Sequence, residues 1–106
     1  MDKLLIKKSP ALKGSVTISG AKNAALPVLI SSLLASSECT FTNVPNLRDI
    51  NTTILLLRDF GAKVNQITAN SVEIDASKLD SVTASYELVR TMRASILVLG
   101  PLLAKY

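Results

Sequence analysis

Ser19-Gly20-Ala21-Lys22-Asn23-Ala24-Ala25-Leu26-Pro27 is the stretch around which the rest of the chain is organised. It joins a predicted strand to a predicted helix through a glycine turn, and it leaves a lysine and an asparagine where the helix begins. The first N–H groups of a helix have no acceptor within it, and the helix dipole favours negative charge there. The sequence therefore predicts a small anion site, for a phosphate or a carboxylate, at this helix mouth.

The helix that follows the turn is predicted over residues 24–35. Its apolar residues recur at a spacing of three to four and form one face, made of Leu26, Leu29, Ile30, Leu33 and Leu34. Proline has no N–H and is comfortable only in the first turn of a helix, so Pro27 indicates an N-cap near Asn23 or Ala24. Lys22 and Asn23 are then expected at the mouth of the helix.

Alternation of polar and apolar residues predicts the strands. Two are expected before and at the glycine turn, over 3–8 and 15–19, and one after the helix, over 39–44. Residues 62–67 and 71–75 are predicted to form a hairpin, with Asn70 suited to positive φ in its turn.

Two further helices complete the predicted order. One begins at Asn46 or Asp49, has an apolar face of Ile50, Ile54 and Leu57 that Phe60 could extend, and ends at Gly61. The other runs from about Tyr86 toward Leu99, with Ser85 as its cap. Gly100-Pro101 is expected to end or kink the last helix, because the residue before a proline avoids the helical region. The order β-α-β-α-β-β, followed by a helix, predicts an α/β fold in which helices cover one face of a sheet.

Composition excludes several classes of protein. The chain has 106 residues, enough for one small domain, and a net charge of +4 with no His and no Trp. Basic charge with so few aromatic residues argues against single-stranded nucleic acid as a partner. A single cysteine without histidine excludes an internal disulfide and an ordinary zinc site. The apolar runs are too short for a signal peptide or a membrane span, so a cytoplasmic protein with no membrane partner is expected.

Several reactive or charged residues have a plain structural interpretation. Cys39 is expected to be a small buried residue on a strand and not a nucleophile, because no base stands near it in the sequence. Arg90 and Arg93 are three residues apart and are predicted to be neighbours on one side of the last helix. Arg48 and Asp49 are expected to face solvent, although Arg48 at a helix start could also reach an anion.

Residues 17–27, Thr-Ile-Ser-Gly-Ala-Lys-Asn-Ala-Ala-Leu-Pro, closely resemble the N-terminal signature of the UDP-N-acetylglucosamine enolpyruvyl transferases, which catalyse the first committed step of peptidoglycan synthesis. Three more stretches match in the same order, over residues 43–53, 74–77 and 88–95, and Leu99-Gly100-Pro101 follows them. The resemblance covers essentially the whole chain.

The resemblance implies a reaction and a set of site residues. The enolpyruvyl group of phosphoenolpyruvate moves to the 3-hydroxyl of UDP-N-acetylglucosamine with release of phosphate, and no cofactor is needed. Lys22, as a catalytic residue, and Asn23 match positions that contact phosphoenolpyruvate, and Arg93 matches a position in the UDP-sugar site. A lysine beside free helix N–H groups suits a phosphate, and an arginine fork suits a diphosphate. Arg90 is the weaker candidate, with a surface role expected.

The resemblance also implies an architecture larger than this chain. Family members form an inside-out α/β barrel of two domains built from β-α-β-α-β-β units, with the active site between them. Residues 1–106 then correspond to an N-terminal part, in which residues 1–20 pack with the second domain. The general-acid cysteine lies on a later glycine-rich loop, and Cys39 does not match that motif. The chain alone is therefore expected to be inactive and to need the remainder of the enzyme as its partner.

A second hypothesis is a non-catalytic α/β module that binds anions or other proteins. Its basis is the apolar run Leu102-Leu103-Ala104 near the C-terminus, which could support self-association of the last helix.

Overall fold

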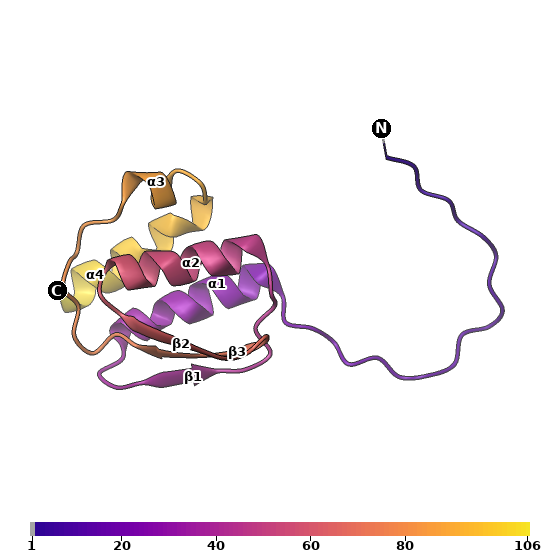
Figure 1. The fold of residues 1–106 in the computed structure, drawn as a ribbon, viewed down its shortest axis with the longest axis horizontal. Coiled ribbons are helices and arrows are strands. Elements are labelled where there is room, and N and C mark those ends of the chain that lie inside the picture. The colour runs from indigo at the N-terminus through magenta and orange to yellow at the C-terminus, as the bar shows by residue number, and fades with distance from the viewer. Residues whose placement is uncertain (1) are drawn as a thin grey trace.

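The computed structural model describes residues 2–106, which divide into an extended arm and a folded body (Figure 1). The arm, residues 2–19, has no helix or strand and every residue in it is exposed. The strands predicted over 3–8 and 15–19 are therefore wrong for this structure. A strand needs a neighbour to satisfy its N–H and C=O groups, and the arm lies against no other segment.

The body begins with α1 (Lys22–Ile30), which continues as the 3-10 helix η1 (Ser31–Leu34). The predicted apolar face is confirmed for four of its residues, which are buried, whereas Leu34 is 53% exposed; the buried four are Leu26, Leu29, Ile30 and Leu33. The tighter turn of η1 rotates Leu34 away from the core, since 3-10 geometry places residues three apart on one face.

A three-stranded antiparallel sheet forms the second layer. Its strands are β1 (Cys39–Phe41), β2 (Lys63–Thr68) and β3 (Ser71–Asp75), in the order β1-β3-β2. The register pairs Phe41 with Val72 and Val64 with Ile74. The predicted hairpin is confirmed, but Asn70 in its turn does not have positive φ; among the described non-glycine residues only Asn43 does, at 54°.

Helix α2 (Arg48–Asp59) lies beside α1 on the same face of the sheet (Figure 1). Its predicted apolar face is confirmed, with Ile50, Ile54, Leu57 and Phe60 all buried. Gly61 ends the helix with φ of 100°, as predicted. These side chains meet Val72 and Ile74 of β3, both fully buried, so the core lies between the two helices and the central strand.

The C-terminal part differs from the single helix predicted over residues 86–99. It consists of α3 (Tyr86–Val89), the 3-10 helix η2 (Arg93–Val98) and α4 (Leu99–Lys105). Met92 has an extended backbone, φ −146° and ψ 118°, and interrupts the helical path. Pro101 does not end the helix: it is the third residue of α4, and proline is tolerated in the first turn of an α-helix.

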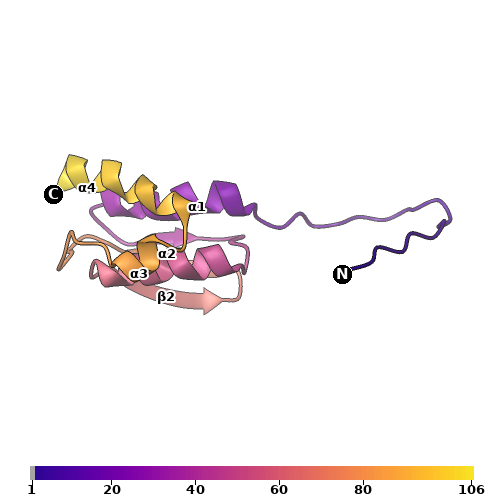
Figure 2. The same ribbon diagram turned by 90° about the horizontal axis from the view of Figure 1, so that it is seen from above.

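The C-terminal helices cover the two central ones. The helix α4 packs against η1, η2 packs against α1, and α3 packs against α2 (Figure 2). Lys105 Nζ donates a hydrogen bond to the carbonyl of Ala35, and the hydroxyl of Tyr106 donates to the carbonyl of Ala76 at 3.1 Å. The described fold is thus a mixed α/β arrangement with helices over a small antiparallel sheet, and the first strand of the predicted β-α-β-α-β-β order is absent from it.

Candidate functional site

The junction between arm and body is built by a close approach of two backbones. A Cβ placed on Gly20 would lie 1.9 Å from the carbonyl oxygen of Asn43, so no side chain fits there. The sequence predicts a glycine that is needed for a special turn conformation, but Gly20 does not have positive φ. Its small size is what the structure requires, because it lets the chain pass Asn43 and enter α1.

Helix α1 begins two residues earlier than predicted. Its N-cap is Ala21, and the first intrahelical bond runs from Ala25 N–H to the carbonyl of Ala21 at 2.9 Å. Lys22 and Asn23 therefore lie in the first turn of the helix and not before it. Pro27 sits beyond the first turn, where it leaves the carbonyl of Asn23 without its usual donor; both residues are exposed, so water can replace the lost N–H.

The three residues assigned to the site from the sequence lie around one cavity. Lys22 and Asn23 of α1 and Arg93 of η2 line a cleft of about 280 Å³, together with Asp49 at the start of α2. Leu26, Thr91, Met92 and Ala94 complete the wall. We call this cavity the Lys22 cleft. The first turns of α1 and α2 both contribute to it, so two positive helix ends face the same space.

Asp49 is the residue of this cleft that sequence reasoning missed as a functional residue. Its Oδ2 lies 3.2 Å from Nζ of Lys22, and the two side chains are 32% and 44% exposed. The sequence indicated Asp49 only as a possible helix start that faces solvent. In the structure the N-cap of α2 is Leu47, and Asp49 lies in the first turn of the helix. Nothing in the spacing of residues 22 and 49 predicts that the two helix ends meet.

Arg93 lies at the cleft because the helical path is interrupted at the residue before it. Met92 is 5% exposed and packs against α2, where the hydroxyl of Thr53 lies 3.5 Å from its sulfur. This contact holds the start of η2 beside the first turns of α1 and α2. Arg93 itself is exposed and makes no ion pair in the described part of the chain, so its guanidinium is free to meet a ligand.

The other residues considered from the sequence lie outside the cleft. Arg90 and Arg93 are not on one helix as predicted, because Arg90 is the C-cap of α3 and Arg93 starts η2. Arg90 pairs with Glu87 at 3.3 Å and lies 6.0 Å from the ring centroid of Tyr86. Arg48 is exposed and is not part of the wall. Cys39 is half-buried, and its sulfur lies 3.7 Å from the carbonyl of Ser37.

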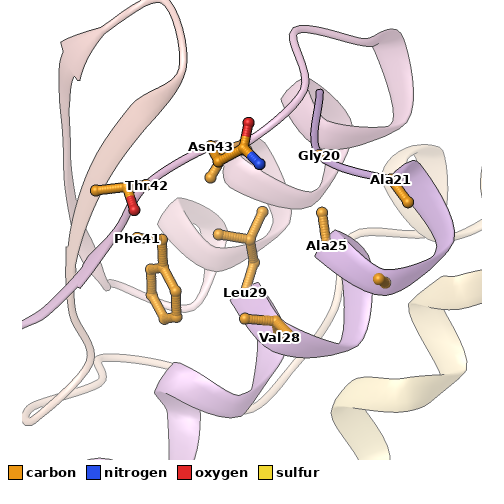
Figure 3. A pocket seen from close by; sticks show the side chains of 10 residues that line it. Gly20, Ala21, Ala25, Val28, Leu29, Phe41, Thr42 and Asn43 are labelled. Carbon is orange, nitrogen blue, oxygen red and sulfur yellow. The ribbon is translucent and has the colours of Figure 1, made fainter. Parts of the chain in front are cut away.

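A second hollow lies on another side of α1, where Figure 3 shows Val28, Leu29 and Phe41 around it. It has a volume of about 180 Å³ and its wall, which includes Gly20 and Asn43, contains no charged side chain. A cavity without a cation is poorly suited to a phosphate or carboxylate. The Lys22 cleft is therefore the better candidate for an anion.

Comparison with known proteins gives the class of protein to which this cleft belongs. The family model described as EPSP synthase (3-phosphoshikimate 1-carboxyvinyltransferase) matches residues 6–106. The chain therefore belongs to the EPSP synthase family of enolpyruvyl transferases.

Within this family, the chain is similar to one kind of transferase. The chain is 64% identical to the UDP-N-acetylglucosamine 1-carboxyvinyltransferase of Pseudoalteromonas atlantica, and 58% identical to those of Shewanella woodyi and Geotalea uraniireducens. Each match covers 100% of this chain and 25% of the relative. The chain is thus a homologue of these transferases that spans a quarter of their length.

A solved structure supports the fold. The enolpyruvyl transferase NikO from Streptomyces tendae matches with a TM-score of 0.76 at 24% identity, over 89% of this chain and 22% of that one. In the part of the chain that the structure describes, no helix has the length and apolar character needed to cross a membrane.

Proposed function

We propose that this chain forms one wall of the active site of a UDP-N-acetylglucosamine enolpyruvyl transferase, an enzyme of peptidoglycan synthesis. In this reaction the 3-hydroxyl oxygen of the sugar bonds to C2 of phosphoenolpyruvate, and phosphate leaves from the same carbon. The observation that carries the proposal is the meeting of Lys22, Asn23 and Arg93 at one cleft. These residues come from distant parts of the sequence, and each matches a family position for one of the substrates.

Lys22 and Asn23 are proposed to hold phosphoenolpyruvate. The first turn of α1 presents backbone N–H groups without intrahelical acceptors beside the Lys22 ammonium. This combination suits a ligand that carries both a phosphate and a carboxylate. It also stabilises negative charge that moves onto the leaving phosphate, which is where an electrostatic contribution to catalysis is expected from this wall.

Arg93 is proposed to bind the UDP-sugar. Its planar guanidinium offers paired donors that match the oxygens of a diphosphate. Because Arg93 and Lys22 line the same cleft, the acceptor and donor substrates would lie next to each other. Such proximity is a general requirement for transfer between two bound molecules.

The chain alone is proposed to bind and not to turn over substrate. The resemblance puts the general acid on a loop that is not among these 106 residues, and proton transfer by a positioned acid contributes about two to four orders of magnitude to rate. Robust phosphate release from phosphoenolpyruvate and UDP-N-acetylglucosamine by this chain would contradict this part of the proposal.

Titration with phosphoenolpyruvate tests the binding half. We expect backbone amide signals of Lys22 and Asn23 to shift in a two-dimensional NMR spectrum, and Lys22→Ala to weaken binding about tenfold or more, as for loss of a charge-assisted hydrogen bond. Lys13→Ala is the matched control, since it removes the same charge from the exposed arm. Equal affinity of the two variants would show that the cleft is not the site.

An interaction module is a second candidate function, favoured by the exposed apolar residues of η2 and α4. Ile96 is 68% exposed and Leu103 is 74% exposed. Sedimentation of the chain tests it: a stable oligomer that Leu103→Lys dissociates would favour this function, and a monomer would count against self-association through α4.

A further inference from the structure

Lys22, on which the proposed anion binding depends, already forms an ion pair with Asp49. Asp49 Oδ2 lies 3.2 Å from Lys22 Nζ, and both side chains line the Lys22 cleft. An anion that enters this cleft meets the lysine already paired, with a carboxylate beside it. We infer that Asp49 is the resident counter-ion of Lys22, and that it competes with phosphate for this lysine.

The surroundings of Asp49 hold its backbone in place. It lies in the first turn of α2, where the helix dipole favours a carboxylate. Its backbone carbonyl accepts a hydrogen bond from the Thr53 hydroxyl at 2.9 Å, and Thr53 is fully buried. The backbone that carries the carboxylate is therefore held by the core, whereas Lys22 reaches it through a flexible stem.

Charge bookkeeping gives the direction of the effect. The side chains of the cleft carry two positive charges, on Lys22 and Arg93, and one negative charge, on Asp49. Removal of the carboxylate doubles the net side-chain charge that a phosphate meets, and it frees the ammonium. The inference rests on the proposed function, because it treats the cleft as the phosphate site; it adds that Asp49 pairs again with Lys22 as phosphate leaves and so favours product release.

The test measures inorganic phosphate binding to the full 106-residue chain by NMR titration at constant ionic strength. Asp49→Asn keeps the shape of the side chain and removes its charge. We expect this variant to bind phosphate roughly three- to tenfold more tightly than the wild type, the size expected for one unit charge a few ångströms away in a largely solvated cleft.

Two control variants separate charge in the cleft from other effects. Glu38→Gln changes net charge equally, but Glu38 precedes β1 and is not part of the cleft wall, so its affinity should stay within about twofold of the wild type. Asp49→Glu keeps the negative charge and should show no gain either. A melting curve for each variant confirms that it is folded.

The outcomes distinguish this inference from the proposed function. If Lys22→Ala weakens phosphate binding but Asp49→Asn leaves it unchanged or weakens it, the counter-ion role is wrong and the anion site stands. If neither the wild type nor Asp49→Asn shifts the amide signals of Lys22 and Asn23, both the anion site and the counter-ion role are wrong.

Discussion

Residues 15–19 and 71–75 are both short runs in which β-branched residues alternate with polar ones. The second run is β3, which pairs with β1 on one side and β2 on the other, and its Val72 and Ile74 are fully buried. The first run belongs to the arm, where Val16 is 84% exposed and Ile18 is 77% exposed. Alternation therefore marks which face of a run can be buried, and a strand forms only where a neighbour is present to bury it.

Replacing one isoleucine in each run gives the largest expected difference. Ile74→Ala removes a fully buried side chain from the centre of the core, and we expect it to lower the free energy of unfolding by about 2–5 kcal/mol. Ile18→Ala makes the same chemical change in the arm and should alter stability by less than about 0.5 kcal/mol. Urea unfolding followed by circular dichroism measures both.

The same two variants can also show that the arm and β3 do not differ in this way. A loss of more than about 1 kcal/mol for Ile18→Ala would mean that the arm packs against the body in solution, since surface substitutions lie within about ±0.5 kcal/mol. The arm would then be a strand of the fold, as its alternation predicts.

The junction of arm and body gives the next largest effect. In Gly20→Ala the new Cβ would meet the Asn43 carbonyl at 1.9 Å, so the backbone must shift, and we expect a loss of about 1–3 kcal/mol. Gly100→Ala is the control: apart from its chain neighbours and the backbone of its own helix, no atom lies within 4 Å of the added Cβ. Alanine is favoured over glycine in a helix, but the residue before a proline resists the helical region, so the two effects oppose each other and the net change should be small. Thermal melting should show a clear loss for Gly20→Ala and little change for Gly100→Ala.

The turn of the hairpin is joined to the segment that follows β1. Asn70 Nδ2 donates to the carbonyl of Val44 at 2.9 Å, and the Val44 N–H donates to the carbonyl of Asn70 at 2.8 Å. Asn70→Ala removes the first of these bonds, and a loss of about 1 kcal/mol is expected. Asn65→Ala on the exposed side of β2 is the matched change and should cost less. Equal losses would mean that the side-chain bond of Asn70 contributes nothing.

The local sequence pattern was sufficient to predict an element where the apolar residues that recur along it are the ones that become buried. Helix α2 was predicted with its buried residues Ile50, Ile54 and Leu57 and with its stop at Gly61, and the hairpin with both of its strands. Helix α2 and strand β3 bury a periodic set of side chains, so the period of their apolar residues and the packing agree. Strand β2 is mostly exposed and is held by its pairing with β3.

Tertiary contacts determine the features that the local sequence pattern did not predict. The helix predicted over 86–99 breaks at Met92 because this side chain packs against Thr53 of α2, thirty-nine residues earlier in the chain. After this break Arg93 starts a new helix, η2, and lines the cleft, whereas Arg90 does not. Lys22, Asn23 and Arg93 were expected from the resemblance, but their meeting, and the presence of Asp49 among them, depends on three helix ends that no local signal relates.

The smallest expected effect concerns acid stability at the end of the hairpin. Asp75 Oδ1 accepts hydrogen bonds from the Ser77 hydroxyl at 2.6 Å and from the Ser77 N–H at 2.9 Å, and these bonds lower the pKa of the carboxyl below its ordinary value. A carboxyl with a lowered folded-state pKa stabilises the fold above its unfolded pKa and loses this contribution as pH falls through the folded value. Ser77→Ala should therefore be less stable than the wild type at pH 7, and the difference should shrink below about pH 4.

Ser31→Ala is the control for this prediction. It removes a hydroxyl that donates to the Val28 carbonyl, which does not titrate, so its difference in stability from the wild type should be the same at pH 7 and at pH 3. Urea midpoints of the three chains at pH 7 and at pH 3 measure this, and a constant difference for Ser77→Ala would show that the hydroxyl acts without regard to the charge of Asp75.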